Sequence, residues 1–251
     1  MKIGVIIQAR MSSTRLPGKI LKKFHGERTL LDVLLDNLRG IHDVKTVVAT
    51  STNPADNRLE AFLQAKGEIC FRGSEADVLE RFINAAETNG FEGIVRICSD
   101  NPFLDRDGIE VLVDKATTSD ADYIGFRIND KPSILTHFGF WGEFVRLSAL
   151  KSVFESTLSN TPAHEHVTYH VYANPDKYKC EWIEVDSFLQ GREDIRLTVD
   201  TAEDFENAKE VYAALKRHKD VFSLRDVVAY LDGHSEIKDS MRNNISKNVK
   251  E

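Results

Sequence analysis

The sequence has few cysteines, no long apolar run and no excess of positive charge, and each absence excludes a class of protein. The three cysteines lie far apart and form no CxxC pair, which indicates reduced thiols in a cytoplasmic protein rather than a disulfide framework. No apolar segment is long enough for a membrane-spanning helix or a signal peptide, so neither is expected. The 40 acidic residues outnumber the 33 basic ones, which argues against a nucleic-acid partner.

Several common binding motifs are also missing. The sequence contains neither the GxxxxGK[ST] of a P-loop, nor GxGxxG, nor the HExxH of a metal-binding helix. It has no internal repeat and no linker rich in proline or glycine, so one domain is expected over residues 1–233. Residues 234–251 are polar and have no hydrophobic period, which predicts a frayed tail.

The first half alternates short β-rich runs with helical runs. Ser74 is a plausible N-cap, with Asp77 three positions later as in a capping box. This alternation predicts right-handed βαβ units and a mostly parallel sheet with helices on both faces. The expected strands are 2–7, 45–50, 68–73 and 93–100, and the expected helices are 29–40, 54–67, 74–90 and 106–119.

The second half departs from this alternation. Residues 122–147 are β-rich and aromatic, which predicts a β-rich insertion within the single domain. The later segments predict helices near 148–157 and 163–173, strands at 178–186 and 195–200, and helices at 202–218 and 223–233.

A basic segment follows the first expected strand. Residues 8–23 carry five basic side chains and no acidic one. Ligands of an open parallel sheet bind beyond the carboxyl ends of its strands, so this segment is placed to bind an anion. Arg10, Arg15 and Lys19 can neutralise phosphate oxygens, while Ser12, Ser13 and the loop N–H groups can add hydrogen bonds. The plain alternative is a solvated surface loop.

Two aspartates come at the ends of later expected strands, Asp100 at the end of 93–100 and Asp200 at the end of 195–200. Two carboxylates suit one Mg²⁺, which completes its shell with water and phosphate. Each also has a structural alternative, because Asp100 could have a turn or helix-cap role before Pro102 and Asp200 could cap the helix that starts near Ala202. Together with the basic segment, the pair predicts a site for a metal-bound nucleoside triphosphate.

Five segments spread over residues 1–231 are distinctive: "QARMSSTRLPGKIL", "RGSEADVLERF", "RICSDNPFLD", "EHVT" and "RLTVDTAEDFENAKEVYAAL". They resemble the cytidylyltransferase family, which includes the acylneuraminate and 3-deoxy-manno-octulosonate cytidylyltransferases, and within it the SpsF-like branch of spore coat polysaccharide biosynthesis. The resemblance implies a Rossmann-like nucleotidyltransferase domain of the GT-A type, with a mixed, mostly parallel sheet. It also implies Mg²⁺-dependent transfer of CMP from CTP to a sugar, release of pyrophosphate, a role in surface polysaccharide or glycoconjugate synthesis, and a homodimer.

The resemblance also implies roles for individual residues. Arg10, Arg15, Lys19 and Asp100 would be catalytic, and Asp100 and Asp200 would bind the metal. The nucleotide-binding set would be Ala9, Arg10, Ser12, Ser13, Arg15, Lys19, Arg72, Ser74, Asp77, Arg81 and Ser99, with a helix-surface ion pair as the alternative for Arg81. The sugar-side set would be Asn101, Glu143, Glu165 and His166. The family pattern near Glu143 reads G-L-D-V-E, but Trp141 and Gly142 replace its D-V here, so the acceptor sugar stays open.

Other patterns leave rival functions open. His166 and His170 are spaced i, i+4, which permits zinc on one helix, but no third ligand is evident and contacts with sugar or at a dimer interface are preferred. The triplets at 105–107 and 120–122 read DxD, so a glycosyltransferase that uses a nucleotide-sugar is the second hypothesis. A nucleotide-binding protein without catalysis is the third. The aromatic cluster Phe138, Phe140, Trp141 and Phe144 is expected in the core or at a dimer interface, with a sugar-stacking platform as the alternative.

Overall fold

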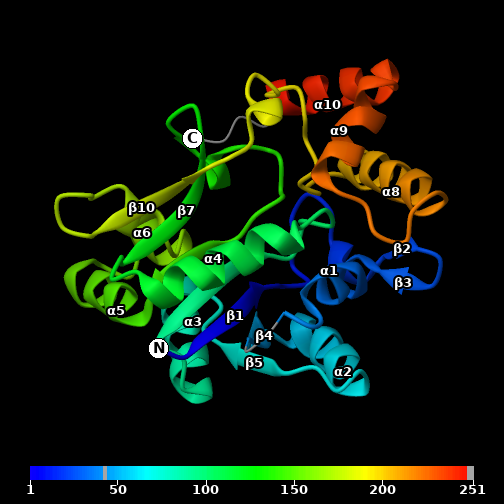
Figure 1. The fold of residues 1–251 in the computed structure, drawn as a ribbon. Helices are drawn as coiled ribbons and strands as arrows, with labels where there is room; N and C mark the ends of the chain where they lie inside the picture. Colours follow the sequence, from blue (N-terminus) through cyan, green and yellow to red (C-terminus); the bar gives the residue numbers. More distant parts are fainter. Residues whose placement is uncertain (42–43, 248–251) are drawn as a thin grey trace.

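A mixed sheet forms the centre of the molecule in the computed structural model, which describes residues 1–41 and 44–247 (Figure 1). The strand order is β10-β7-β9-β6-β1-β4-β5, with β8 paired to β7. β1 runs parallel to both β4 and β6, whereas β9 runs antiparallel to both β6 and β7. The predicted mixed, mostly parallel sheet is therefore confirmed. The strands are β1 Ile3–Gln8, β4 Lys45–Ser51, β5 Cys70–Gly73, β6 Gly93–Cys98, β7 Tyr123–Ile128, β8 Lys131–Pro132, β9 Glu143–Arg146 and β10 Cys180–Glu184.

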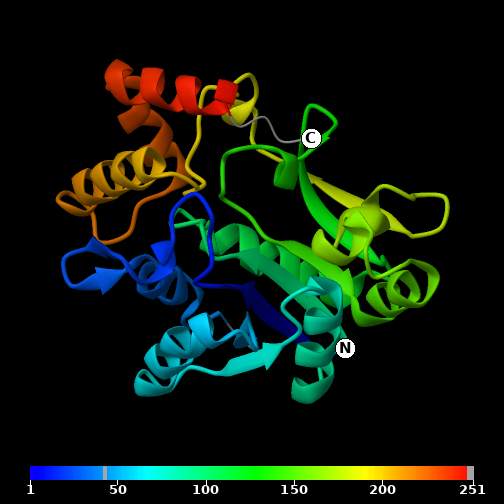
Figure 2. The same ribbon diagram turned by 180° about the vertical axis from the view of Figure 1, so that it is seen from behind.

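Helices cover both faces of the sheet, as Figures 1 and 2 show from opposite sides. The continuous apolar run of β1 explains why, since Val5 and Ile7 pack into one core and Ile6 into the other. The helices are α1 Leu30–Leu38, α2 Asn57–Ala65, α3 Val78–Asn89, α4 Arg106–Thr118, α5 Leu147–Ser156, α6 Pro162–Glu165, α7 Tyr169–Tyr172, α8 Ala202–Lys216, α9 Leu224–Asp232 and α10 Ser235–Lys247. A small hairpin, β2 Lys23–His25 and β3 Arg28–Thr29, precedes α1.

Two predicted features of the middle of the chain are wrong in detail. The N-cap of α3 is Asp77, whose side chain accepts the Glu80 N–H at 2.8 Å, whereas Ser74 accepts the N–H of Asp77 one turn earlier at 3.1 Å. The helix begins only where the buried face starts, at Val78. The single helix expected at 163–173 is divided into α6 and α7, because His166 leaves the helical conformation with φ −103° and ψ 73°.

The strand expected at 195–200 does not form. The segment bends at Thr198 and its apolar side chains are buried, but its N–H groups bond to loops instead of a strand. Leu197 donates to the carbonyl of His137 and Val199 to that of Asp100, both at 2.9 Å. Residues 195–199 are all buried, so the alternation that predicted a strand reflects a segment inside the protein that does not pair within the sheet.

The tail expected to fray at 234–251 is instead helix α10 as far as Lys247, and residues 248–251 lie outside the described part of the chain. Ile237, Met241 and Asn244 are buried on one side of the helix, which packs on α8 and α9. Only two of these three buried side chains are apolar, so the sequence pattern was too weak to show the face. No helix among the described residues is both long and apolar enough to cross a membrane.

Candidate active site

The basic loop after β1 is held in place by a buried carboxylate. Asp56 is fully buried and accepts the Met11 N–H at 2.7 Å, and its second oxygen accepts the Ser51 N–H at 3.1 Å. Burial alone would raise the pKa of Asp56, but these backbone and side-chain hydrogen bonds lower it. The loop closes at Gly18, whose φ of 67° is in the left-handed region and whose N–H reaches the Met11 carbonyl at 3.0 Å. Asp56 was missed in the sequence, where it reads as part of a helix start.

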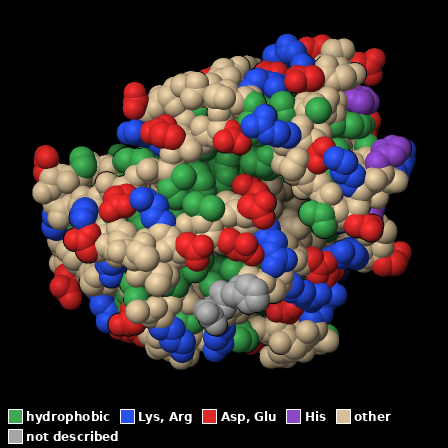
Figure 3. Space-filling model, viewed as in Figure 1, with side chains coloured by type: hydrophobic (Ala, Val, Ile, Leu, Met, Phe, Trp, Pro, Cys, Tyr) green, Lys and Arg blue, Asp and Glu red, His purple; other side chains and the backbone are tan. Residues whose placement is uncertain are grey.

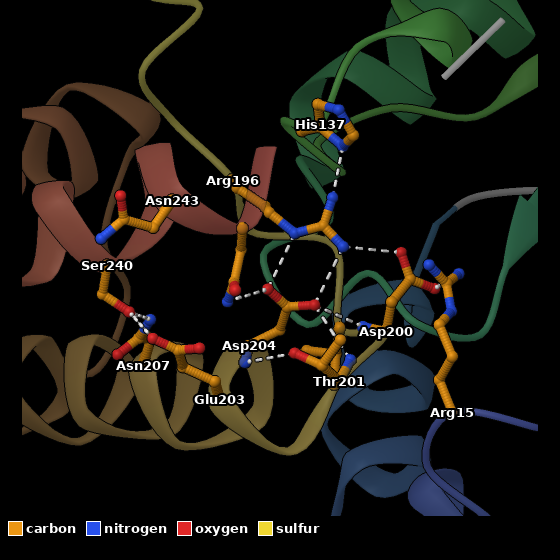
Figure 4. A network of polar contacts seen from close by, with 12 residues as sticks. Arg15, His137, Arg196, Asp200, Thr201, Glu203, Asp204, Asn207, Ser240 and Asn243 are labelled. Carbon is orange, nitrogen blue, oxygen red and sulfur yellow. Dashed lines mark hydrogen bonds and ion pairs between the residues drawn. The ribbon is translucent and has the colours of Figure 1, made fainter. Parts of the chain in front are cut away.

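The predicted cations and aspartates meet at the carboxyl edge of the sheet. Lys19 Nζ lies 3.2 Å from Asp100 Oδ2, 3.6 Å from Asp200 Oδ1 and 2.6 Å from the Val199 carbonyl. Arg15 Nη2 lies 2.9 Å from Asp200 Oδ1, and Figure 4 shows the Arg15 side chain turned toward Asp200. Lys19 is buried, whereas half of the Arg15 side chain is exposed. Segments far apart in sequence thus form one charged cluster.

The two aspartates fit a divalent cation. The ammonium of Lys19 is within reach of both carboxylates, so both point to a position that accepts positive charge. No group of three or more His, Cys, Asp and Glu side chains able to hold a metal occurs within residues 1–41 and 44–247. A metal here would therefore take most of its ligands from water and phosphate, as Mg²⁺ does.

Neither aspartate caps a helix, although Asp100 does lie in a turn, which was part of its structural alternative. The N-cap of α8 is Thr201, which exchanges hydrogen bonds with Asp204 in a capping box. The N-cap residue of α4 is Asp105, not Asp100. The carboxylates of Asp100 and Asp200 are instead directed at the basic residues of the first loop.

A cleft of about 160 Å³ opens beside this cluster and is lined in part by Arg15, Asp100 and Asp200. Asn101 and Thr198 also line it, and in the described part of the chain Asn101 Oδ1 and Thr198 Oγ1 are buried without a hydrogen-bond partner. Buried polar atoms of this kind are costly unless a ligand or water satisfies them. The wall of the cleft thus combines charged and polar side chains, with the predicted Asn101 among them.

An arginine that the sequence analysis missed lies behind the cluster. Arg196 is buried and bonds to Asp204, to Asp200 and to His137 Nδ1 (Figure 4). Burial alone would lower the pKa of Arg196, but the hydrogen bonds and charges of Asp204 and Asp200 raise it. The sequence signal for this network is the spacing of Arg196, Asp200 and Asp204 at i, i+4 and i+8. The first two of these residues fall in the strand expected at 195–200, so the spacing does not stand out.

Arg72 is engaged away from the cluster. Its guanidinium donates to the carbonyls of Ser51 and Asn53, both at 2.9 Å, and to the side chains of Asn57 and Glu60 at 2.7 and 2.8 Å. These contacts brace the segment between β4 and α2. The predicted place of Arg72 beside a nucleotide stays a prediction, but its donors already have acceptors.

The start of α3 carries three other predicted nucleotide-binding residues. Asp77 caps the helix with one oxygen and lies 2.6 Å from His164 Nδ1 with the other. Arg81 is buried and donates to the Ser74 carbonyl at 2.5 Å, so it is not a helix-surface ion pair. Burial and the neighbouring charge of exposed Arg10 lower the pKa of Arg81. The carboxylates of Asp56, Asp77 and Glu75 act in the opposite direction on the pKa of Arg81.

The remaining loop and strand-end residues lie around the same edge. Ala9 is buried and bonds through its N–H to the Ala49 carbonyl at 3.2 Å, and the Ser99 N–H reaches the Gln8 carbonyl at 3.2 Å. Ser12 is exposed and Ser13 is half-buried on the loop. Their hydroxyls are therefore reachable by a ligand that contacts the loop.

Glu143 lies inside the sheet and not on a ligand-facing surface. Its carboxylate accepts Arg96 Nη1 at 2.7 Å, Tyr123 Oη at 2.6 Å and Thr168 Oγ1 at 3.1 Å. Burial and the charge of Glu143 hold the pKa of Tyr123 well above its usual value, so the phenol keeps the proton that it donates. Arg96 also donates to Gln8 Oε1 at 3.2 Å, so the network around Glu143 extends to the end of β1.

The "EHVT" segment is divided between surface and core. Glu165 and His166 are exposed, whereas Thr168 and His164 are buried. His166 ends α6 and His170 lies in α7, so the two are not on one helix as the zinc alternative required.

The DxD triplets lie outside the cluster. Asp105 and Asp107 occupy the start of α4, as expected for acids at a helix N-terminus. Asp120 pairs with Lys179, and Asp122 precedes β7, where it accepts the Lys179 N–H at 2.9 Å. The aromatic cluster of Phe138, Phe140, Trp141 and Phe144 is buried in the core, as expected.

A second hollow lies on the face shown in Figure 3, where apolar side chains gather between charged ones. Its volume is about 350 Å³, and its lining includes Val111 of α4, Ile183 of β10 and Leu224 of α9. None of its lining residues comes from the basic loop after β1. This hollow therefore does not share the Lys19 and Arg15 cluster that lies beside Asp100.

Comparisons with known proteins agree with this geometry. The cytidylyltransferase family model matches residues 4–229. The spore coat polysaccharide biosynthesis protein SpsF of Bacillus subtilis is 34% identical over 221 residues, which are 86% of this chain and 88% of that protein. A cytidylyltransferase structure from Leptospira borgpetersenii superposes with a TM-score of 0.80 at 28% identity, covering 94% of this chain and 96% of that one.

A more distant structure shares the fold. CMP:2-keto-3-deoxy-manno-octonic acid synthetase in complex with CTP gives a TM-score of 0.65 at 15% identity, covering 86% of this chain and 100% of that one. The sequence resemblance and the predicted nucleotidyltransferase fold are thus confirmed. The chain belongs to the cytidylyltransferase family and is a CTP-dependent nucleotidyltransferase.

Proposed function

We propose that the protein transfers CMP from CTP to a hydroxyl group of a sugar, with Mg²⁺ bound and pyrophosphate released. The observation that carries the proposal is the meeting of Lys19 and Arg15 with Asp100 and Asp200 at the carboxyl edge of the sheet. An acidic 2-keto-3-deoxy sugar or a related sugar is the proposed acceptor class, and surface polysaccharide or glycoconjugate synthesis the proposed role. The names of the SpsF relative and of the CMP-sugar synthetase support both.

Each charged residue has a role that follows from its position. Asp100 and Asp200 would hold Mg²⁺, which when bound supplies charge neutralisation and brings phosphate and hydroxyl oxygens together. Arg15 and Lys19, which pair with those carboxylates in the structure, would turn to the β- and γ-phosphates of the nucleotide. Exposed Arg10 would stabilise charge at the α-phosphate, where the sugar hydroxyl attacks in line.

Other predicted residues would complete the nucleotide and sugar sites. The serine hydroxyls and N–H groups of the loop would add hydrogen bonds to phosphate, and Ala9 and the start of α3 would face the base and ribose. Asn101 would contact the sugar, since it lines the cleft beside Asp100. Exposed Glu165 and His166 would contact the sugar or a second copy of the chain. A cytoplasmic homodimer, with the β-rich insertion at its interface, is part of the proposal.

Pyrophosphate release measured with CTP, Mg²⁺ and a panel of 2-keto-3-deoxy sugars tests the proposal. Product should form with CTP and one or more sugars, and Asp100→Ala should abolish it. Asp107→Asn is the matched control, since Asp107 is exposed at the start of α4 and lies outside the cluster. Activity that survives in Asp100→Ala would contradict the metal role. Turnover of a nucleotide-sugar without use of free CTP would favour the glycosyltransferase alternative.

A further inference from the structure

The second layer of the active site is organised by Arg196, whose side chain is fully buried. Its Nε and Nη2 donate to the two oxygens of Asp204 at 2.8 and 2.9 Å, and Nη2 also donates to Asp200 Oδ2 at 3.0 Å. Its Nη1 lies 2.6 Å from His137 Nδ1. A guanidinium only donates, so His137 accepts at Nδ1 and carries its proton on Nε2. Arg196 thus ties Asp200 to α8 and to the loop before β9.

Asp204 holds the backbone as well as the arginine. One of its oxygens accepts the N–H groups of Asp200 and Thr201, at 3.1 and 2.9 Å. Asp200 is therefore fixed twice, through its main chain by Asp204 and through Oδ2 by Arg196. Its other oxygen, Oδ1, is left facing Arg15 and Lys19 in the cleft. The orientation of the carboxylate thus depends on residues that do not face the cleft themselves.

Helix α10 contacts the carboxylate of Asp204 from the side opposite the cleft. Asn244 is buried and donates its side-chain NH₂ to Asp204 Oδ1 at 3.2 Å. One turn earlier, Ser240 donates to Glu203 at 2.6 Å and accepts from Asn207 at 2.7 Å, so it binds α10 to α8 without touching Asp204. Figure 4 shows Ser240 of α10 beside Glu203 and Asn207 of α8. The family model ends at residue 229, before α10 begins.

We infer that α10 is part of the active-site scaffold. Asn244, Asp204 and Arg196 act as positioning residues that turn Asp200 Oδ1 toward the bound metal–nucleotide complex. The inference rests on the proposed function, because it assigns a support to the proposed metal ligand Asp200. Helix α10, which the sequence predicted to be a frayed tail, would then have a role in nucleotide and metal binding.

Two variants and one matched control test the relay. Arg196→Lys keeps the charge but cannot bond both carboxylates in a fork, and Asn244→Ala removes one donor to Asp204. Ser240→Ala is the control, because it removes an α10–α8 contact of similar strength that does not reach Asp204. Each full-length protein is first compared by thermal unfolding, and then Mn²⁺ binding in the presence of CTP is measured from the electron paramagnetic resonance signal of free Mn²⁺.

Arg196→Lys should weaken Mn²⁺ binding by about 10- to 100-fold, as is usual for an outer-shell partner of a metal ligand. Asn244→Ala should weaken Mn²⁺ binding by roughly threefold to tenfold, and Ser240→Ala by less than about twofold, since only Asn244→Ala removes a hydrogen bond to the Asp204 carboxylate. The KM for Mg²⁺ should rise in the same order.

The results that overturn the inference differ from those that overturn the proposed function. If the wild-type protein binds Mn²⁺ with CTP and the Arg196 and Asn244 variants bind it as tightly, the relay is refuted alone. Equal losses in Asn244→Ala and Ser240→Ala also refute it, because docking of α10 would then be sufficient. A wild-type protein that binds no Mn²⁺ in the presence of CTP contradicts both.

Discussion

Replacing Glu143 with Gln should destabilise the fold and leave the sugar KM unchanged. Glu143 is 2% exposed and pairs with Arg96 at 2.7 Å, and Arg96 is 9% exposed. The substitution keeps the size of the side chain but leaves the Arg96 charge buried without its counterion. Breaking a buried pair in this way costs about 3–5 kcal/mol, a large part of the roughly 5–15 kcal/mol that stabilises a typical domain. Tyr123 and Thr168 would also lose a charged acceptor.

Urea unfolding followed by circular dichroism measures this loss. Glu184→Gln is the control, because Glu184 also pairs with an arginine, Arg127, but its side chain is 58% exposed. The control should lose about 0–1 kcal/mol. Steady-state kinetics on the folded fraction give the KM for the acceptor sugar. If Glu143→Gln unfolds like the wild type and its sugar KM rises tenfold or more, Glu143 binds the acceptor and the structural reasoning is refuted.

Three further predictions follow from other sites. Asp56 has a lowered pKa, so it stabilises the fold above its unfolded-state pKa of about 4 and this stabilisation is lost as the pH falls through the folded-state pKa. Asp56→Asn should therefore make the free energy of unfolding, measured in urea, depend less on pH in the acid range. An unchanged pH dependence contradicts this. Gly139→Ala should cost about 1–2 kcal/mol at φ +68°, and should raise the sugar KM but not the CTP KM in steady-state assays, because the new Cβ would lie 2.9 Å from Asn101 Oδ1. Lys19→Ala should lower kcat by roughly 100-fold or more, and by more than Arg15→Ala does, since Lys19 is buried between two carboxylates and Arg15 is half-exposed; equal losses would refute that division.

The sheet was predictable because each of its central strands has a recognisable local sequence pattern. β1, β4 and β6 are buried on both faces and read as continuous apolar runs bounded by helical periods. The alternation of such strands with helices along the chain is sufficient to predict parallel pairing. The basic loop was predictable as an anion site for the same reason, because its place follows from the end of β1.

What the sequence could not show depends on contacts between distant segments. The apolar alternation of Ile195, Leu197 and Val199 is typical of a strand, but only the fold decides whether a partner strand lies alongside. Glu143 looks like any acid in a β-rich segment until Arg96 lies across from it on β6. The buried face of α10 includes Asn244, which no hydrophobic pattern counts.

Transfer of labelled phosphorus from CTP to the sugar tests the central claim most directly. CTP is labelled at the α-phosphorus in one reaction and at the γ-phosphorus in another, with Mg²⁺ and an acceptor sugar present. The account predicts that the α-label appears in a CMP-sugar and the γ-label in pyrophosphate, and that Asp100→Ala abolishes both. A γ-label found in free phosphate, or an α-label that never joins the sugar, would contradict it.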